Sequence, residues 1–365
     1  MKQSIPFAAA NSSQAPSLTI GLDLGDRDSH YCVIDEGCQR QDQGRVATTR
    51  EALTKFLEAY RGARIVLEVG GHSPWVSRLA VEAGLEVIVA NARRVKLIGR
   101  NDRKNDRTDA ELLARLGRLD PQLLSPVQHR SSQCQADLSV LRARKIAVET
   151  RTGLINHVRG ASKSFGKRLP SCSPECFHER ALKQIPAELE PALLAILRLI
   201  GQINAEIESF DQVIEGMADQ RHPATQVLRQ VPGVGPVVAL SYVLTLEDPG
   251  RVANSRQAGP YLGLVPRRCD SGDSSPQLRI TKAGDGEVRR LLVISANYIL
   301  GRFGPDCDLR RFGLQIAARG GKNARKRAKT AVARKLAVLL HHLWKTGEVY
   351  DPFHLAKRRG ECLAV

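Results

Sequence analysis

Two short apolar runs, each interrupted by a single acid, constrain the fold of this chain most strongly. The first is LTIGLDLG (18–25), which contains Asp23, and the second is ARIVLEVG (63–70), which contains Glu68. Short apolar runs that end at glycine are typical of buried strands. An ionised carboxylate inside such a strand is costly unless it is paired or binds a cation. If the two strands are neighbours, their acids meet at one edge of a sheet, and we expect a charged site there.

The residues around these runs alternate between strand and helix patterns as far as about residue 120. The patterns predict strands at 18–25, 30–36, 44–49, 63–70 and 85–90, and helices at 50–60 and 73–84. In the second helix we expect Ser73 at the N-cap, Pro74 at the first helical position and Gly84 at the end. Three strands, a helix and then strand–helix repeats favour an α/β domain with a mixed sheet flanked by helices.

The middle of the chain, residues 132–220, has a helical pattern. The run LLAILRLIGQINAEIESFDQVIEGM carries apolar residues at steps that alternate between three and four: Leu193, Ile196, Ile200, Ile203, Ile207, Phe210, Ile214 and Met217. That spacing is typical of a coiled-coil seam. With a less regular helical stretch at 132–160 and a connection at 165–176, it predicts a long antiparallel helical pair, which serves as a spacer or a dimerisation arm. The alternative is a plain packed helix of a bundle.

A third, mainly helical region begins at residue 225. Its segment VLRQVPGVGPVVALSYVL (227–244) places Gly233 and Gly235 between two helical patterns, like a helix-hairpin-helix turn. The free N–H groups of such a turn can hold a DNA phosphate, although a glycine-rich turn between helices is often only a turn. Another helix is predicted from about Glu287, and a last one at about 323–345.

The charge of the chain indicates a polyanionic partner. The net charge is +17, and residues 310–359 hold fourteen Arg and Lys against two acids. Nucleic acid is the commonest such partner; an anionic membrane is the alternative, but we find no run of eighteen apolar residues. The last helix has an apolar stripe formed by Val332, Leu336, Leu339, Leu340 and Leu343. Its cations lie mostly off that stripe, so we expect nucleic-acid contacts rather than only a solvated face, from Arg325, Lys326, Arg327 and Lys329, with Arg334 and Lys335 nearby.

The N-terminus and the cysteines give weaker signals. Residues 1–17 read as a loose tail rather than a signal peptide. The eight cysteines are scattered, which favours free thiols in a reducing cytoplasm over a disulfide framework. Within CSPECFH, the side chains of Cys172, Cys176 and His178 could form part of a zinc site, although no clear second pair of ligands accompanies them.

The segment GRNDRKNDRTDAELLARL (99–116) supplies two further acids. Asp106 and Asp109 are three residues apart at the start of a good helical pattern, so both point the same way. Together with the two strand acids they make four carboxylates, which suit two Mg²⁺ ions and the displacement of a phosphodiester. For each acid alone, an ordinary salt bridge or helix cap is the alternative. We interpret Asp102 as a local salt-bridge partner. We expect the neighbouring cations to bind the DNA strand that is cut: Arg103, Lys104 and Arg107.

These motifs, taken in order, resemble the DEDD transposases of insertion sequences, in the one-hundred-ten (IS110) family. The resemblance rests on three blocks: GLDLGDRDSHYCVID with LEVGG and KNDRTDAELLARL, then VPGVGPVVALSYVLTLEDPGRVANSRQAGPYLGLVPRR, then SGDSSPQLRITKAGDGEVRRLL. It covers nearly all of residues 18–345, and the combination is more specific than any single motif. It implies a ribonuclease-H-like (RuvC-like) catalytic domain (18–125), a coiled-coil arm (130–222) and a transposase domain (225–350). Outside it, we expect a flexible tail (1–17) and a basic tail (351–365).

The resemblance also implies a mechanism and partners. The four acids of the family fall on Asp23, Glu68, Asp106 and Asp109, which would bind Mg²⁺, and its nucleophilic serine falls on Ser271. Ser271 would attack a DNA phosphodiester and form a phosphoserine link, assisted by the acidic site of a second subunit in a dimer or tetramer. The implied partners are double-stranded DNA and a guide RNA encoded by the element, in a bacterial cytoplasm, with no role for a membrane.

From its surroundings alone, Ser271 is a weaker candidate. A serine in CDSGDSS is more often a turn residue, and Ser274 and Ser275 compete with it. A hydroxyl needs a base, a metal or nearby cations to become a good nucleophile. Four cations could stabilise the phosphate charge: Arg267, Arg268, Arg279 and Lys282.

Three other functions stay open at this stage. A RuvC-like junction nuclease would use the four acids and water but not Ser271. An actin-like or sugar-kinase-like phosphotransferase also opens with a strand reading Asp-x-Gly, but it usually needs a second such strand, which we do not find. A non-catalytic DNA-binding protein would need only the basic helix and the Gly233 turn, and would leave Asp23 and Glu68 unexplained.

Overall fold

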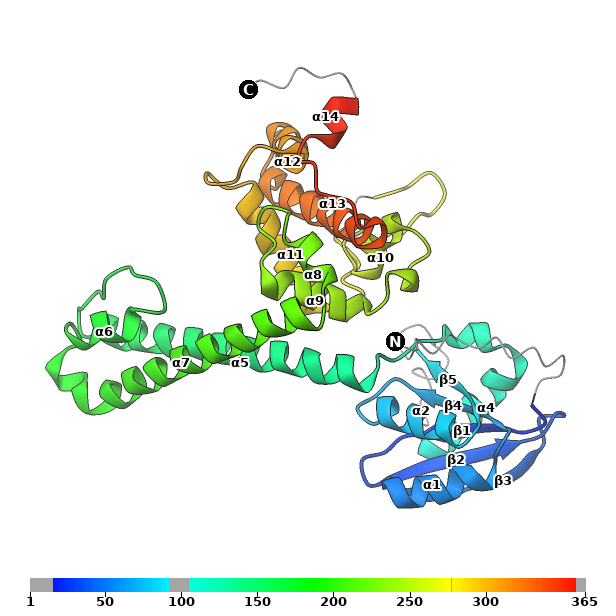
Figure 1. Cartoon of the computed structure of the whole chain (residues 1–365). Helices are drawn as coiled ribbons and strands as arrows, with labels where there is room; N and C mark the ends of the chain where they lie inside the picture. The colour runs from blue at the N-terminus through cyan, green and yellow to red at the C-terminus, as the bar shows by residue number, and fades with distance from the viewer. Residues whose placement is uncertain (1–15, 92–104, 277, 359–365) are drawn as a thin grey trace. The chain divides into compact units, whose positions relative to one another are not determined.

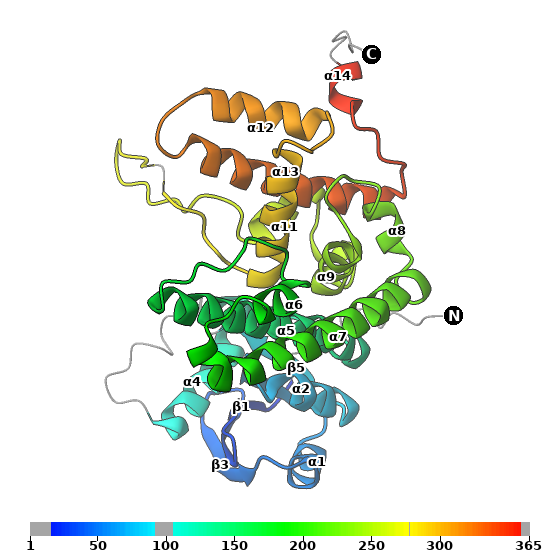
Figure 2. The same cartoon turned by 90° about the vertical axis from the view of Figure 1, so that its left-hand side faces the viewer.

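The computed structural model describes residues 16–91, 105–276 and 278–358. The chain divides into two compact units, Met1–Arg130 and Ser131–Val365 (Figures 1 and 2). The predicted arm and the predicted C-terminal domain therefore belong to one unit. No helix among the described residues has the length and apolar character needed to cross a membrane.

The first unit is built on a five-stranded mixed sheet, as the sequence predicts. Its strands are β1 (Thr19–Asp23), β2 (Asp28–Ile34), β3 (Arg40–Ala47), β4 (Arg64–Glu68) and β5 (Glu86–Ala90), in the order β3-β2-β1-β4-β5. The pairs β1–β2 and β2–β3 are antiparallel, whereas β1–β4 and β4–β5 are parallel. The strand expected at 44–49 is longer and begins at Arg40.

Helices cover both faces of this sheet. On one face, α1 (Arg50–Ala59) and α2 (Ser73–Glu82) bury alternate strand residues such as Ile20 and Leu22. On the other face, α4 (Asp106–Leu119) packs against β1 so closely that a Cβ at Gly21 would lie 1.9 Å from the carbonyl oxygen of Ala110. The missing side chain at Gly21 is thus what lets α4 approach the sheet.

The start of α2 differs from the prediction. The helix begins at Ser73, and His72 rather than Ser73 is its N-cap residue. The Ser73 hydroxyl accepts a hydrogen bond from the Gly70 N–H (3.0 Å) and donates to the Gly70 carbonyl (2.9 Å). It therefore closes the turn that follows β4 instead of capping the helix.

The second unit begins with two long helices that pack against each other, as predicted for the middle of the chain (Figure 1). They are α5 (Ser132–Ser164) and α7 (Glu190–Gln220), joined by a segment that contains α6 (Phe177–Leu182) and a short 3-10 turn (Ala187–Leu189). Near the outer end of the pair, Val158 of α5 packs with Leu193 and Leu197 of α7.

The face of α7 that meets α5 is rotated from the predicted seam. Leu193, Ile200, Ile207, Ile214 and Met217 are buried as expected, whereas Ile196, Ile203 and Phe210 are only half-buried. Polar residues take their place against α5. Arg151 donates to Asn204 Oδ1 (2.9 Å), and Arg144 donates to Asp211 Oδ2 (3.0 Å).

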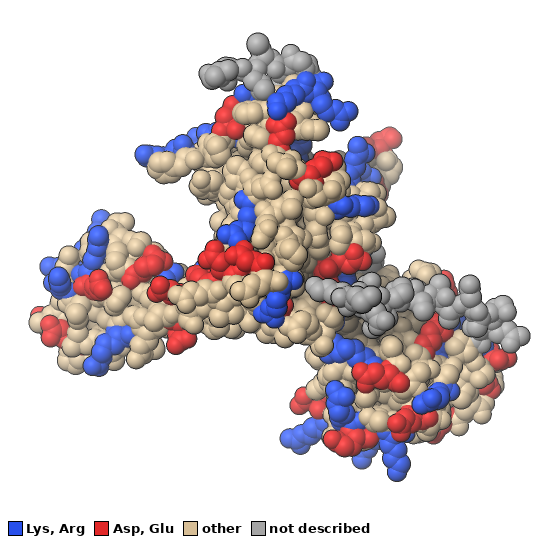
Figure 3. Space-filling view, viewed as in Figure 1, with Lys and Arg blue, Asp and Glu red and all other residues tan. Residues whose placement is uncertain are grey.

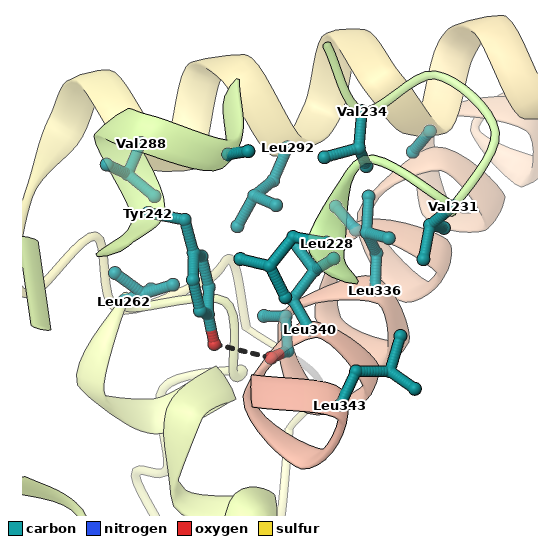
Figure 4. Close-up of a cluster of buried hydrophobic side chains, with 14 of the residues drawn as sticks. Leu228, Val231, Val234, Tyr242, Leu262, Val288, Leu292, Leu336, Leu340 and Leu343 are labelled. Carbon is teal, nitrogen blue, oxygen red and sulfur yellow. Dashed lines mark hydrogen bonds between the residues drawn. The ribbon is translucent and has the colours of Figure 1, made fainter. Parts of the chain in front are cut away.

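The rest of the unit is a helical domain around one core. Its helices are α8 (Ala224–Leu228), α9 (Pro236–Leu246), α10 (Ala258–Tyr261), α11 (Gly286–Ile299), α12 (Asp308–Ala318), α13 (Ala324–Thr346) and α14 (His354–Arg358). The apolar stripe predicted for α13 enters this core through Val332, Leu336, Leu340 and Leu343, whereas Leu339 is half-buried (Figure 4). The Tyr242 hydroxyl donates to the Ala337 carbonyl (2.6 Å) and so satisfies the polar end of a fully buried ring.

Candidate functional site

The two strand acids lie at the same edge of the sheet. Asp23 is the last residue of β1, and Glu68 is the last residue of β4. These strands are parallel neighbours in which Leu22 pairs with Leu67. Asp23 and Glu68 are the next residues along each strand, so they lie side by side at the same edge. Both side chains are half-buried.

Both acids also lie on the face that α4 covers. Side chains alternate between the two faces of a strand. Gly21 contacts α4, and a Cβ at Gly117 of α4 would lie 2.2 Å from Val66 Cγ2. Two residues further along each strand, Asp23 and Glu68 therefore point to the same side of the sheet.

The helix α4 begins at this end of the sheet and brings the other two acids. Asn105 is its N-cap, and its side chain accepts a hydrogen bond from the Arg107 N–H (3.1 Å). Asp106 is exposed, with Oδ2 at 3.8 Å from His30 Nε2. Asp109 is only 4% exposed, and its Oδ1 has no hydrogen-bond partner among the described residues.

His30 was not predicted as a site residue. It lies opposite Asp23 in the antiparallel register of β1 and β2, on the same face of β2 as Cys32, which packs against α4. Its Nδ1 is buried without a hydrogen-bond partner among the described residues. The pairing register of β1 and β2 sets His30 beside Asp23, and the sequence alone could not supply that register.

The donors at this edge fit a divalent cation in chemical type. Carboxylate oxygens are the ligands that Mg²⁺ prefers, and a buried carboxylate oxygen without a partner, as on Asp109, is costly unless a cation approaches it. Within the described parts of the chain, no three or more His, Cys, Asp or Glu lie close enough together to hold a metal ion. Carboxylate donors of the right type are therefore present at this edge, but among the described residues they do not lie close enough to share one metal ion.

One acid and three cations were also predicted to matter near the start of α4. Asp102, Arg103 and Lys104 lie outside the described residues. Arg107 is exposed in the first turn of α4, and its contact with nucleic acid stays a prediction.

The predicted nucleophile lies at the tip of a hairpin in the second unit. Ser271 and Ser274 exchange two backbone hydrogen bonds of 3.1 Å, so Gly272 and Asp273 form a two-residue turn. Gly272 has φ +54°, as the first central residue of a type II′ turn requires. The Ser275 hydroxyl donates to Asp270 Oδ1 (2.8 Å), whereas Ser271 is exposed.

The base of this hairpin is held tightly. Arg289 Nη1 donates to the carbonyls of Leu262 (3.0 Å) and Ala283 (2.8 Å), one on each side of the stem. Lys282 has φ +55°, a conformation that a non-glycine residue adopts only where the surrounding structure enforces it. The four predicted cations on the hairpin are all exposed: Arg267, Arg268, Arg279 and Lys282.

The glycine-rich turn before α9 serves packing at one position and leaves the other open. Gly233 has φ +79°, and a Cβ there would lie 2.9 Å from Tyr298 Cδ1 on α11. Gly235 is the N-cap residue of α9, and it is exposed with no atom near the position of a Cβ. The closeness of α11 therefore explains Gly233, and a phosphate contact stays a prediction for Gly235.

The cysteine-rich loop is not assembled as a metal site. Cys176 is hydrogen-bonded to Ser173, and this bond is the main cause that lowers the pKa of the Cys176 thiol. Burial raises the pKa of the Cys172 thiol. His178 Nδ1 lies 3.4 Å from Asn204 Nδ2 on α7.

The predicted cations of the last helix divide into two sets. Lys326 and Arg327 line a groove beside α13, together with Arg319, whose role the sequence did not suggest. Arg325 and Lys329 lie on the same helix outside the groove. Basic side chains are also visible around α12 and α14 and at the outer end of the α5–α7 pair (Figure 3).

Two family models match the chain. One for DEDD transposases of the IS110 type, described as a transposase, matches residues 20–164 and so includes all four acids. The other, described as the transposase IS116/IS110/IS902 family, matches residues 225–310 and includes Ser271. Together they span more than half of the chain.

Individual proteins are similar over most of their length. The transposase for insertion sequence element IS1111A of Coxiella burnetii is 26% identical, over 91% of this chain and 90% of its own length. A probable family 20 transposase of Pseudomonas aeruginosa is 28% identical, over 91% of this chain and 98% of its own length. The transposase for element IS1328 of Yersinia enterocolitica is 27% identical, over 79% of this chain and 85% of its own length.

Proposed function

The chain belongs to the IS110 family of insertion-sequence transposases, enzymes that cut and rejoin DNA, and on that premise we propose that it does so through Ser271 and a metal-binding acidic edge. The observation that carries the acidic half is the placement of Asp23 and Glu68 at one edge and on one face of the sheet, where α4 brings Asp106 and Asp109. Mg²⁺ at this edge would stabilise charge on the oxygens of the reacting phosphate.

The serine step follows from the chemistry of a phosphodiester. Ser271 Oγ attacks the phosphorus atom and loses its proton, an Oγ–P bond forms, and the bond from phosphorus to one DNA oxygen breaks. The released DNA hydroxyl takes up a proton. Attack of another DNA hydroxyl on the phosphoserine reverses these changes and joins a new strand. The exposed position of Ser271, at the tip of a hairpin that carries four cations, supports the approach of a phosphate.

A strand-transfer experiment in cells tests this proposal and the guide RNA that we propose with it. A plasmid carries the reading frame with its flanking DNA, and amplification across the new DNA joints measures recombination. Denaturation of the cell extract then traps protein linked to DNA. We expect new joints and a covalent adduct, the loss of both when the flanking non-coding DNA is deleted, and recovery when its transcript is supplied separately. Joints or cuts without any adduct would instead favour the metal-dependent nuclease.

We also propose that two copies of the chain associate through α7. Its half-buried or exposed apolar residues lie on a second stripe, next to the one that meets α5: Leu199, Ile203, Phe210 and Val213, with Ile196 at the boundary, where it also packs against the core shared with α5. With Glu206, these positions again alternate in steps of three and four, the spacing by which one helix packs on another. A second copy of the same stripe is the natural partner in a symmetric dimer.

Charges placed on this stripe test the proposed dimer. Leu199 and Val213 are 44% and 47% exposed, so replacing both by aspartate leaves the core of one chain intact. Losing the burial of two apolar side chains, about 1.5–3 kcal/mol each, raises the dissociation constant by roughly 100-fold or more. Leu182→Asp, at a 51% exposed site on α6, is the control. Light scattering on purified protein measures the mass of each variant. Equal masses for the double variant and the unaltered protein would contradict the proposed dimer.

A further inference from the structure

A groove of about 1310 Å³ runs along one side of α13 in the second unit. One wall is the stem of the Ser271 hairpin (264–266 and 278–282), and the other is formed by α12 and residues 348–355. The lining residues of α13 extend from Lys326 to Leu343, which corresponds to about 25 Å of helix. We call this feature the α13 groove.

Cations gather at the hairpin end of the α13 groove. Six exposed ones line it and form no ion pair with an acid among the described residues: Arg279, Lys282, Arg319, Lys326, Arg327 and Arg334. Three acids line the groove, and each has a partner. Asp351 pairs with Lys357 (2.8 Å), Glu348 lies 3.2 Å from His342, and Asp308 Oδ2 accepts a hydrogen bond from the Leu355 N–H (2.6 Å). This end therefore presents positive charge that lacks a counter-ion from the protein.

Apolar side chains form the floor between these cations. Ile316 of α12 and Val338 of α13 line the groove and are half-buried, yet neither packs into the core of the domain. Phe312 also lines the groove, with the Lys335 ammonium 3.7 Å from its ring centroid. Apolar surface of this kind gains free energy only from an apolar partner.

Cations above an apolar floor fit an unpaired nucleic-acid strand better than a duplex. A duplex hides the faces of its bases inside the stack and offers phosphates to the protein. A single strand offers phosphates and base faces together. A base face stacked on an aromatic side chain is worth about 1–3 kcal/mol, and one packed on an aliphatic side chain gains free energy from the apolar area that it buries.

We propose that the α13 groove binds an unpaired DNA strand next to the phosphodiester presented to Ser271. The proposal rests on the proposed function, because a strand that is cut and transferred must leave its duplex before it is joined to a new partner. Since the hairpin that carries Ser271 forms one wall, a strand in the groove continues directly along the stem toward the serine.

The floor is tested by binding measurements on the full chain in a Ser271→Ala background, so that cleavage plays no part. Ile316→Asn and Val338→Asn change the floor, and Leu314→Asn is the matched control, on α12 but outside the groove and 45% exposed. The probes are labelled oligothymidylate of about 15 nucleotides, within the site sizes known for single strands, a DNA duplex of equal length, and oligouridylate. We expect the floor variants to bind oligothymidylate about fivefold or more weakly, with duplex binding and the control unchanged. A fivefold loss corresponds to about 1 kcal/mol, which lies within the free energy of burying an aliphatic side chain.

Unchanged oligothymidylate binding, an equal loss for the duplex, or a loss confined to oligouridylate would each overturn the proposal. A melting temperature for each variant identifies any that fails to fold, and Val338→Thr then replaces it as a milder change of nearly equal volume. Because these assays need no strand transfer, their failure is distinct from failure of the serine mechanism, which recombination reports.

The cations are tested by salt dependence. Arg334 lines the groove, whereas the exposed Lys345 on the same helix does not. We expect Arg334→Gln to reduce the slope of log affinity against log salt for oligothymidylate by about 0.7, the value for one phosphate contact on a single strand, and Lys345→Gln to leave it unchanged. Equal slopes for the two variants would contradict a specific path through the groove.

Discussion

Ser271→Ala is expected to abolish both the covalent protein–DNA adduct and recombination while leaving the fold unchanged. The side chain is exposed at a hairpin tip, and the backbone hydrogen bonds to Ser274 do not depend on it. Losing only the nucleophilic oxygen should lower recombination by roughly 10⁴-fold or more, as for other enzymes that lose a covalent nucleophile. Amplification of new joints in cells and trapping of the adduct measure the two effects.

Neighbouring serines provide the controls for this prediction. Ser275 donates its hydroxyl to Asp270, so Ser275→Ala should loosen one contact of the hairpin and lower recombination only slightly. Ser274 holds the turn through its backbone, so Ser274→Ala should also retain activity. Full activity in Ser271→Ala, or complete loss in Ser274→Ala alone, would assign the nucleophile to a different residue.

The strand pattern of the first unit could be predicted because each strand carries its own signal. Apolar runs mark β1 and β4, and the acid at the end of each run marks the edge where they meet. His30 carries no such signal, because its place beside Asp23 depends on the pairing of β1 with β2. Ser73 was assigned as a cap from its type and position, but the turn at Gly70 provides a competing partner for its hydroxyl.

The packing of the two long helices could also not be predicted in full from local patterns. Spacing alone predicted one apolar seam on α7, yet two stripes are present, and polar pairs such as Arg151 with Asn204 decide which stripe meets α5. Those partners are more than fifty positions apart in the chain, so no local pattern reveals them. The α13 groove could not be predicted from the sequence at all, because its walls come from segments between residues 264 and 355 that meet only in the folded domain.

Asp109→Asn is the second change with a large expected effect, and it separates a metal ligand from a structural residue. Asp109 is buried, and its Oδ1 has no partner among the described residues. A neutral amide of nearly the same shape removes the cost of burying a charge, so the melting temperature without divalent metal should stay equal or rise. Recombination should fall by about a hundredfold to ten-thousandfold, the value of several kcal/mol of charge stabilisation.

Metal binding gives a readout of Asp109 that does not depend on activity. A cation that binds the folded protein raises its melting temperature, so Mg²⁺ or Mn²⁺ should stabilise the unaltered protein and stabilise Asp109→Asn much less. Asp102→Asn, which changes the acid that matches no family position, should keep both the metal response and recombination. A stability loss in Asp109→Asn together with an unchanged metal response would mean that Asp109 holds α4 against the sheet and binds no metal.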